Sequence, residues 1–154
     1  MCRALRVLAA LVAIEVLGVI ASCAQSVNQK DSCSAHADRL PKFRIARDER
    51  VGADGLQVFV SVEPTQISQA SLLSLGCRLG LKYRDNQFLF VWFFDSYSVA
   101  KVWRLAPVEQ TWPSQALRGS YSFDRKNGSH ELLWFPNKDD HSQSSRIGLG
   151  SPPP

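Results

Sequence analysis

Apolar and polar residues alternate where regular patterning begins in this chain. Phe43 and Ile45 alternate with Lys42 and Arg44, and a period of two is typical of a strand with one solvated face. Residues 48–55 contain two glycines and four charges and are predicted to form a turn. The valine-rich residues 56–62 predict a second strand.

Residues 70–84 fit two patterns. Their apolar positions alternate like those of a long strand, but they also form adjacent stripes on a helix. We predict a helix, because no Val, Ile or Thr occurs between Ala70 and Arg84 and a strand of this length would be unusual. Pro64 ends the preceding strand and Thr65 is an acceptable N-cap, whereas Gly76 and Gly80 each weaken the helix by about 1 kcal/mol relative to Ala.

The second half of the chain predicts three further elements. Residues 88–94 are uninterruptedly apolar, as expected for a central strand that is covered on both faces. Ser96 is a suitable N-cap for a short helix that extends towards Trp103. Residues 117–124 and 130–135 flank the turn signal Asn127-Gly128 and predict a β-hairpin.

These elements indicate an α+β fold. We expect a mixed sheet of about five strands with one long and one short helix and a C-terminal β-hairpin, the long helix forming a right-handed crossover. The predicted organisation is a single small domain at 41–135, preceded by a flexible arm at 25–40. Residues 136–154 are dominated by Ser, Gly, Pro and charge, and we predict a disordered tail there.

Residues 1–24 have the three parts of an export signal. Arg3 and Arg6 precede a mostly apolar stretch at 7–20, and small residues follow at 21–24. Glu15 interrupts the apolar stretch, which is shorter than the roughly 20 residues that a membrane-spanning helix needs. We therefore expect export rather than an uncleaved membrane anchor.

The end of this segment, Ile20-Ala21-Ser22-Cys23, resembles the lipobox of bacterial lipoproteins, with Ile in place of the commoner Leu. The resemblance implies acylation of Cys23, which would become the new N-terminus, and Ala24 in place of Asp implies outer-membrane retention. The alternative is cleavage after Ala24, which yields a soluble exported protein. The expected location is thus the periplasm, the outer membrane or the extracellular space, and the mature domain resembles no named family.

Export leaves two cysteines, Cys33 and Cys77, which in an oxidising compartment suggest one disulfide. The alternative is a buried Cys77 and a free Cys33 on the arm. The sequence has no CxxC pair and no cysteine–histidine spacing typical of zinc sites, so we predict neither a metal site nor a cofactor.

Asp95 follows the predicted central strand directly, where ligands gather in open α/β sheets, and Tyr97 would line the same edge. The alternative is that Asp95 and Ser96 only cap the short helix. A small exported hydrolase-like enzyme could use Asp95 with His130 or Arg118. No GxSxG motif or phosphate-binding glycine loop supports a more specific chemistry.

Charge and aromatic residues suggest partners. The formal net charge of +4 includes Arg3 and Arg6, so a mature chain would be only weakly basic and a nucleic-acid partner is not indicated. A basic stretch could meet anionic lipid headgroups or an acidic partner, or be an ordinary solvated strand face. It consists of Arg39, Lys42, Arg44, Arg47 and Arg50. Trp103 and Trp112 flank a proline-bracketed loop and are candidates for a binding patch.

Taken together, these features favour a non-catalytic binding or structural module of the cell envelope over the enzyme that uses Asp95. The expected partners are a membrane, through the lipid on Cys23, and another protein.

Overall fold

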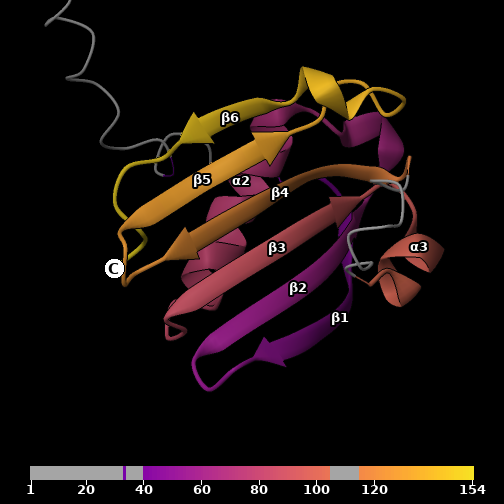
Figure 1. Ribbon diagram of the computed structural model, residues 1–154. Helices are drawn as coiled ribbons and strands as arrows, with labels where there is room; N and C mark the ends of the chain where they lie inside the picture. Colours follow the sequence, from indigo (N-terminus) through magenta and orange to yellow (C-terminus); the bar gives the residue numbers. More distant parts are fainter. Residues whose placement is uncertain (1–32, 34–39, 105–114) are drawn as a thin grey trace, which may run out of the picture. The chain divides into compact units, whose positions relative to one another are not determined.

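The computed structural model describes Cys33 and residues 40–104 and 115–154, all within the compact unit Asp31–Pro154. They form a six-stranded sheet in which the strands lie side by side in chain order, as Figure 1 shows. The strands are β1 (Phe43–Val51), β2 (Gly55–Val62), β3 (Phe88–Phe94), β4 (Leu117–Asp124), β5 (Ser129–Trp134) and β6 (Ser145–Gly148). The helices are α2 (Gln69–Lys82) and α3 (Tyr97–Val102), with short 3-10 turns η2 (Pro64–Gln66) and η3 (His141–Gln143).

The sheet is mixed, so the α+β class is confirmed. The β2 and β3 strands pair in parallel and are connected through α2, whereas all other neighbouring strands pair antiparallel. The hairpin of β4 and β5 is also present, and Gly128 in its turn has a φ of 68°, a backbone conformation that favours glycine. The predicted strand number of about five omits β6.

The segment whose apolar positions fit both a strand and a helix is helical in α2, as predicted. Its N-cap residue, however, differs from the predicted Thr65. Thr65 lies in η2, and Ser68 is the N-cap of α2. The Ser68 hydroxyl accepts a hydrogen bond from the Ser71 backbone N–H, and the Ser71 hydroxyl accepts one from the Ser68 N–H. This reciprocal capping box satisfies two amide groups that the start of a helix leaves without backbone partners.

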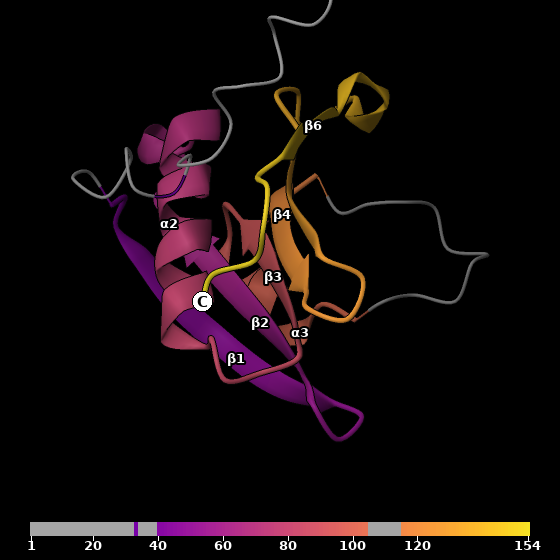
Figure 2. The same ribbon diagram turned by 90° about the vertical axis from the view of Figure 1, so that its left-hand side faces the viewer.

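The two faces of the sheet are covered differently. The α2 helix lies over one face of the sheet, as Figure 2 shows from the side. It packs mainly against β3, β4 and β5. Its leucines form the main core with the inward-facing side chains of the strands, among them Val58, Val91, Tyr121 and Leu132. The short α3 helix packs against β1, β2 and β3, and its Ala100 belongs to a second cluster with Phe59, Trp92, Phe94, Leu117 and Phe135.

The first hairpin departs from prediction at its turn. Residues 48–51 belong to β1, where Asp48 pairs with Val58 and Arg50 with Leu56, so the turn is shorter than the predicted 48–55. Charged residues are compatible with this strand because β1 is at the edge of the sheet, where one side of the strand remains open to solvent.

The prediction of a disordered tail at 136–154 is wrong, and the folded domain therefore does not end at residue 135. After η3, β6 pairs with β5, and Ile147 packs against the main core. Leu149 is buried, and the Arg125 side chain donates a hydrogen bond to the Pro153 carbonyl over 2.6 Å. Two apolar residues at period two, Ile147 and Leu149, join the core, and backbone pairing and the bond from Arg125 attach the rest of this polar segment.

Residues 1–24, with Cys23, lie outside the described residues, and so does the predicted arm except for Cys33 and Leu40. None of the described helices has the length and apolar character that a membrane span needs.

Candidate functional site

The edge predicted to bind a ligand lies where the parallel strands β2 and β3 end. A hollow of about 290 Å³ opens there between the first residues of β1 and the start of α3. Its charged and polar lining includes Lys42, Arg44, Glu63, Asp95 and Tyr97. The guanidinium carbon of Arg44 lies 3.9 Å from the centre of the Tyr97 ring, so a cation–π contact joins β1 to α3 at this edge. The structure thus brings Asp95 and Tyr97 together in one hollow.

Asp95 also faces a basic side chain on the neighbouring strand β4. Its Oδ2 lies 3.8 Å from Nη1 of Arg118 on β4. Burial raises the pKa of Asp95 above its ordinary value, and the positive charges of Arg118 and Lys138 oppose this rise. The side chain is therefore a partly buried carboxylate beside a neutralising arginine.

The cap of α3 rests on Ser96. The Ser96 hydroxyl accepts a hydrogen bond from the Val99 backbone N–H over 3.4 Å, as the sequence predicted for this residue. The suggestion that Asp95 shares the capping role is not supported, because the Asp95 carboxylate faces Arg118 and its backbone N–H donates to the Ala116 carbonyl.

His130 lies at the opposite end of the sheet from Asp95. The β3–β4 register places Phe94 beside Leu117, whereas His130 pairs with Phe123 near the other end of β4. The proposed pairing of Asp95 with His130 is therefore excluded by register, and of the two partners considered only Arg118 lies beside Asp95. Within residues 33, 40–104 and 115–154, no three His, Cys, Asp or Glu side chains gather as a metal-ion site would require.

His130 instead belongs to a buried hydrogen-bonded chain. Its Nε2 lies 2.8 Å from the Tyr121 hydroxyl and its Nδ1 lies 2.9 Å from the Ser151 carbonyl. A carbonyl can only accept, so Nδ1 carries the proton and Nε2 accepts from Tyr121. Burial lowers the pKa of His130, and the bond to Ser151 opposes this effect. The chain ties β4 and β5 to the C-terminal segment.

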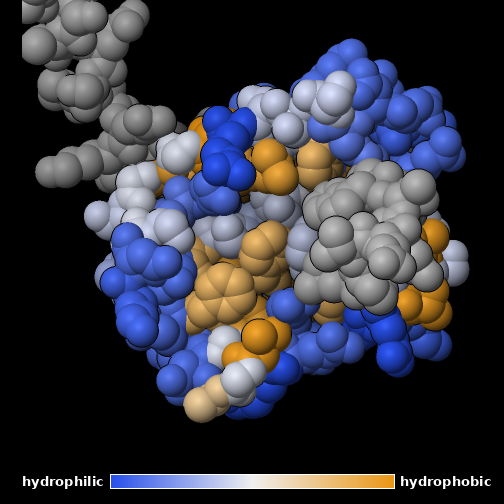
Figure 3. Space-filling model, viewed as in Figure 1, coloured by the Kyte–Doolittle hydropathy of each residue, from blue (hydrophilic) through white to orange (hydrophobic). Residues whose placement is uncertain are grey.

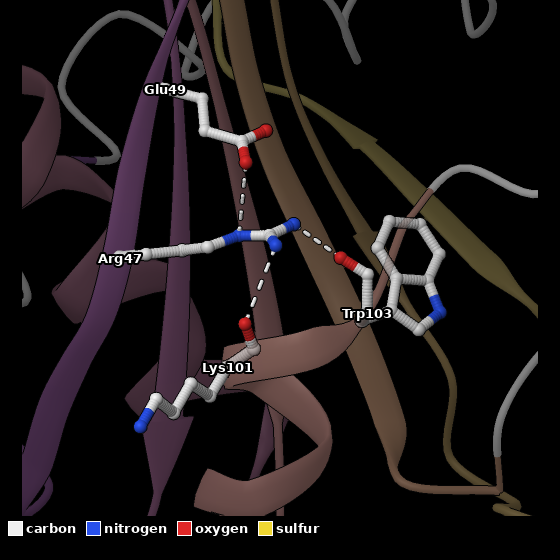
Figure 4. A network of polar contacts seen from close by, with 4 residues as sticks. All are labelled: Arg47, Glu49, Lys101 and Trp103. Atoms are coloured by element: carbon white, nitrogen blue, oxygen red, sulfur yellow. Dashed lines mark hydrogen bonds and ion pairs between the residues drawn. The ribbon is translucent and has the colours of Figure 1, made fainter.

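Trp103, a candidate for a binding patch, is half-buried within an aromatic cluster. Its ring centre lies 4.8 Å from that of Trp92 and 5.5 Å from that of Phe94. Figure 4 shows Arg47 of β1 reaching the end of α3, where its guanidinium donates to the carbonyls of Trp103 and Lys101. The same side chain forms an ion pair with Glu49, and its carbon Cζ lies 3.9 Å from the Phe59 ring centre. Trp112 lies outside the described residues.

The aromatic cluster continues along β3 as a row. Phe90 stacks 4.3 Å from Trp92, and Phe88 follows at 6.2 Å, both half-buried. Figure 3 views this face of the sheet and shows apolar residues gathered over its middle between polar borders. The uninterrupted apolar run at 88–94 was the sequence signal for this row, although it was interpreted only as a covered strand.

The basic stretch predicted on β1 is divided by the structure. Arg44 and Arg47 contact Tyr97 and Phe59, whereas Arg50 lines a separate hollow with Asp54, Asp85 and Arg125. An irregularity in β1 between Ile45 and Arg47 puts Arg44 and Arg47 on the side of α3, whereas Arg50 pairs with Leu56 of the main core on the other side, so the arginines do not form one continuous basic face.

The structure joins Cys33 to Cys77 in a disulfide across 44 residues, with their Cα atoms 5.4 Å apart. Cys77 lies on the buried side of α2, and the bridge attaches the segment before β1 to this helix.

One surface was not anticipated from the sequence. Phe43 and Ile45 of β1 face α2 across a hollow of about 370 Å³, whose other lining residues are Arg78, Leu79, Leu81 and Lys82. The period-two pattern of β1 placed Phe43 and Ile45 on one face, but it could not show that α2 leaves them uncovered.

Comparison with protein-family models, curated proteins and solved structures gives no match.

Proposed function

We propose that this chain is an exported protein of the cell envelope that acts as a non-catalytic binding or structural module and is attached to the membrane by a lipid on Cys23. The Cys33–Cys77 disulfide is the observation that carries the export part of this proposal. Disulfides persist in oxidising compartments and are rare in the cytosol. The signal-like residues 1–24 and the lipobox-like Ile20-Ala21-Ser22-Cys23 point to the same compartment.

The surroundings of the titratable residues favour binding over catalysis. Asp95 is neutralised by Arg118, and His130 uses both ring nitrogens to hold Tyr121 and Ser151. A general base must reach the proton that it removes, and both candidates are engaged in contacts within the fold. The half-buried aromatic row of Phe88 and Phe90 offers apolar contact area instead.

Mass analysis of the mature protein from a bacterial host tests the proposal. We expect a diacylglycerol-modified Cys23 as the N-terminal residue and no free thiol on Cys33 or Cys77 without a reductant. A free N-terminus at Gln25 would replace the lipoprotein with a soluble exported protein. An intact Met1 with two free thiols would contradict export altogether.

The second candidate function is a small exported hydrolase that uses Asp95. Two observations favour it, namely the raised pKa of this carboxyl and its position in a hollow with Tyr97. Turnover of chromogenic esters or glycosides that is lost in Asp95→Asn would establish this function, because Asn cannot transfer the proton or act as the nucleophile. Unchanged turnover in Asp95→Asn would exclude a role for this residue.

A further inference from the structure

The surface between β1 and α2 is an open apolar hollow, here called the β1–α2 groove. It is lined by Phe43, Ile45, Arg78, Leu79, Leu81 and Lys82 and has a volume of about 370 Å³. The groove exists because α2 lies mainly over β3, β4 and β5, so the α2-facing side chains at the start of β1 are not fully covered.

The groove exposes large apolar side chains from both elements. Leu81 of α2 is 47% exposed and Phe43 of β1 is 40% exposed, and Leu40, just before β1, is 42% exposed. Single exposed apolar residues are ordinary on protein surfaces. Here, however, Phe43 and Leu81 line the same hollow, and adjoining apolar side chains of this kind mark interaction surfaces.

The charged residues that line the groove are all basic. Arg78 and Lys82 border the apolar side chains. Within the described part of the chain, neither forms an ion pair with an acidic side chain. Lys82 contacts the Tyr83 ring with its Nζ 4.8 Å from the ring centre, which leaves its charge available. The groove therefore complements a partner that is apolar and negatively charged.

The disulfide places the start of the domain beside this surface. Cys77 immediately precedes Arg78 and lies one helical turn before Leu81, so its bond to Cys33 holds the N-terminal segment on the helix that forms one wall of the groove. Cys23 is ten residues before Cys33, and ten extended residues span at most about 35 Å. A lipid on Cys23 would thus keep α2 close to the bilayer.

We propose that the β1–α2 groove docks onto an anionic membrane surface, with Phe43 and Leu81 entering the interface and Arg78 and Lys82 contacting the lipid headgroups. This inference rests on the proposed function, because the short tether from Cys23 is what favours a membrane over an acidic protein. Partial burial of apolar side chains together with electrostatic attraction is how peripheral proteins bind such surfaces.

Vesicle binding by the full exported protein tests the docking. Its binding constant is measured for anionic vesicles of phosphatidylcholine mixed with phosphatidylglycerol and for neutral vesicles of phosphatidylcholine alone. The measured quantity is the ratio of the first constant to the second. An acyl chain binds both kinds of vesicle, so the ratio reports the contribution of the basic residues of the protein, and the variants below assign it to the groove. We expect a ratio well above one that falls with added salt, because surface charges are screened.

Two variants and one control sharpen this test. Arg78→Gln with Lys82→Gln should lower the ratio by about 25-fold, since each basic residue near an anionic surface contributes roughly 1 kcal/mol, or about fivefold. Leu81→Ser should weaken binding to both vesicle types. Lys101→Gln with Val102→Ser alters an exposed cation and an apolar side chain that is 71% exposed on α3, and it should leave the ratio unchanged.

The outcomes separate the docking from the proposed function. A ratio near one for the wild-type protein, or equal losses in the control, would overturn the docking and point to an acidic protein partner. Mass analysis of the same preparation reports on Cys23 independently. An acylated Cys23 with a ratio near one removes the docking alone, whereas a high ratio without acylation supports docking and contradicts the lipid anchor.

Discussion

At the scale of single residues, the close approach of α2 to the sheet depends on two glycines. A Cβ atom added at Gly76 would lie 2.6 Å from Cδ2 of Tyr121, and one added at Gly80 would overlap the Tyr121 hydroxyl. These glycines reduce helix propensity, but they make room for the largest side chain of the main core.

Gly76→Ala is therefore expected to destabilise the protein by about 1 to 3 kcal/mol, because overpacking outweighs the helix propensity that alanine adds. Urea unfolding measures the change. Gly148→Ala is the matched control, since a Cβ there meets nothing within 4 Å. Higher stability in Gly76→Ala would show that the approach of Tyr121 is not limiting.

The cap of α3 leads to a second expectation. Ser96→Ala should lower the free energy of unfolding by about 0.5 to 2 kcal/mol, and Ser96→Asn should retain most of it because Asn also caps well. Thermal melts of both variants report this difference. Equal melting temperatures for the wild type and Ser96→Ala would mean that the hydroxyl contributes nothing at this end of the helix.

His130 should make stability depend on pH. Burial lowers its pKa in the folded protein, so the unfolded chain binds more protons below the ordinary histidine pKa of about 6.5. We therefore expect the free energy of unfolding to fall as the pH decreases below about 6.5. Denaturant unfolding across this pH range measures the slope, and His130→Gln, which does not titrate there, should flatten it. The same slope in His130→Gln would assign the effect to other groups.

At the scale of elements, the main feature is that the C-terminal residues extend the sheet. Leu149 is 4% exposed and its backbone N–H donates to the His130 carbonyl over 2.8 Å, so the chain remains attached after β6 ends. His130 Nδ1 and the Arg125 side chain donate to the carbonyls of Ser151 and Pro153.

Leu149→Ala should thus cost about 2 to 5 kcal/mol of stability, as truncation of a buried leucine commonly does. Val102→Ala on α3 is the control and should change stability by less than about 0.5 kcal/mol, because this side chain is mostly exposed. Calorimetry of both variants compares them. If Leu149→Ala melts like the wild type, residues after β5 do not contribute to the folded domain.

At the scale of the whole molecule, the disulfide connects the N-terminal segment to α2. A bond that closes a loop across 44 residues stabilises a protein by about 4 kcal/mol in the chain-entropy treatment, mainly through the unfolded state. Reduction should therefore lower the melting temperature without changing the sheet. Melts with and without dithiothreitol measure the difference, and the double variant Cys33→Ser with Cys77→Ala should not respond to the reductant. A wild-type melt that is insensitive to dithiothreitol would contradict this stabilising role.

Local patterns of the sequence determined much of this protein. The alternation around Phe43 and Val58, the apolar run at 88–94 and the Asn127-Gly128 turn predicted strands and a hairpin that are present, and the absence of Val, Ile and Thr between Ala70 and Arg84 predicted α2. These predictions succeeded because neighbouring residues alone set period, turn conformation and helix propensity. The N-terminal signal is likewise a local pattern, and it remains a prediction.

Contacts between distant residues were decided only by the tertiary structure. From the sequence alone, Cys33 and Cys77 could be bonded or free, His130 was a possible partner of Asp95, and residues 136–154 were predicted to be disordered. In the structure, the strand register separates His130 from Asp95. The β6 strand, which contains Ile147, pairs with the open edge of β5. The position of α2 leaves Phe43 and Leu81 in one groove. Each outcome depends on which elements become neighbours after folding, and no pattern of adjacent residues contains that information.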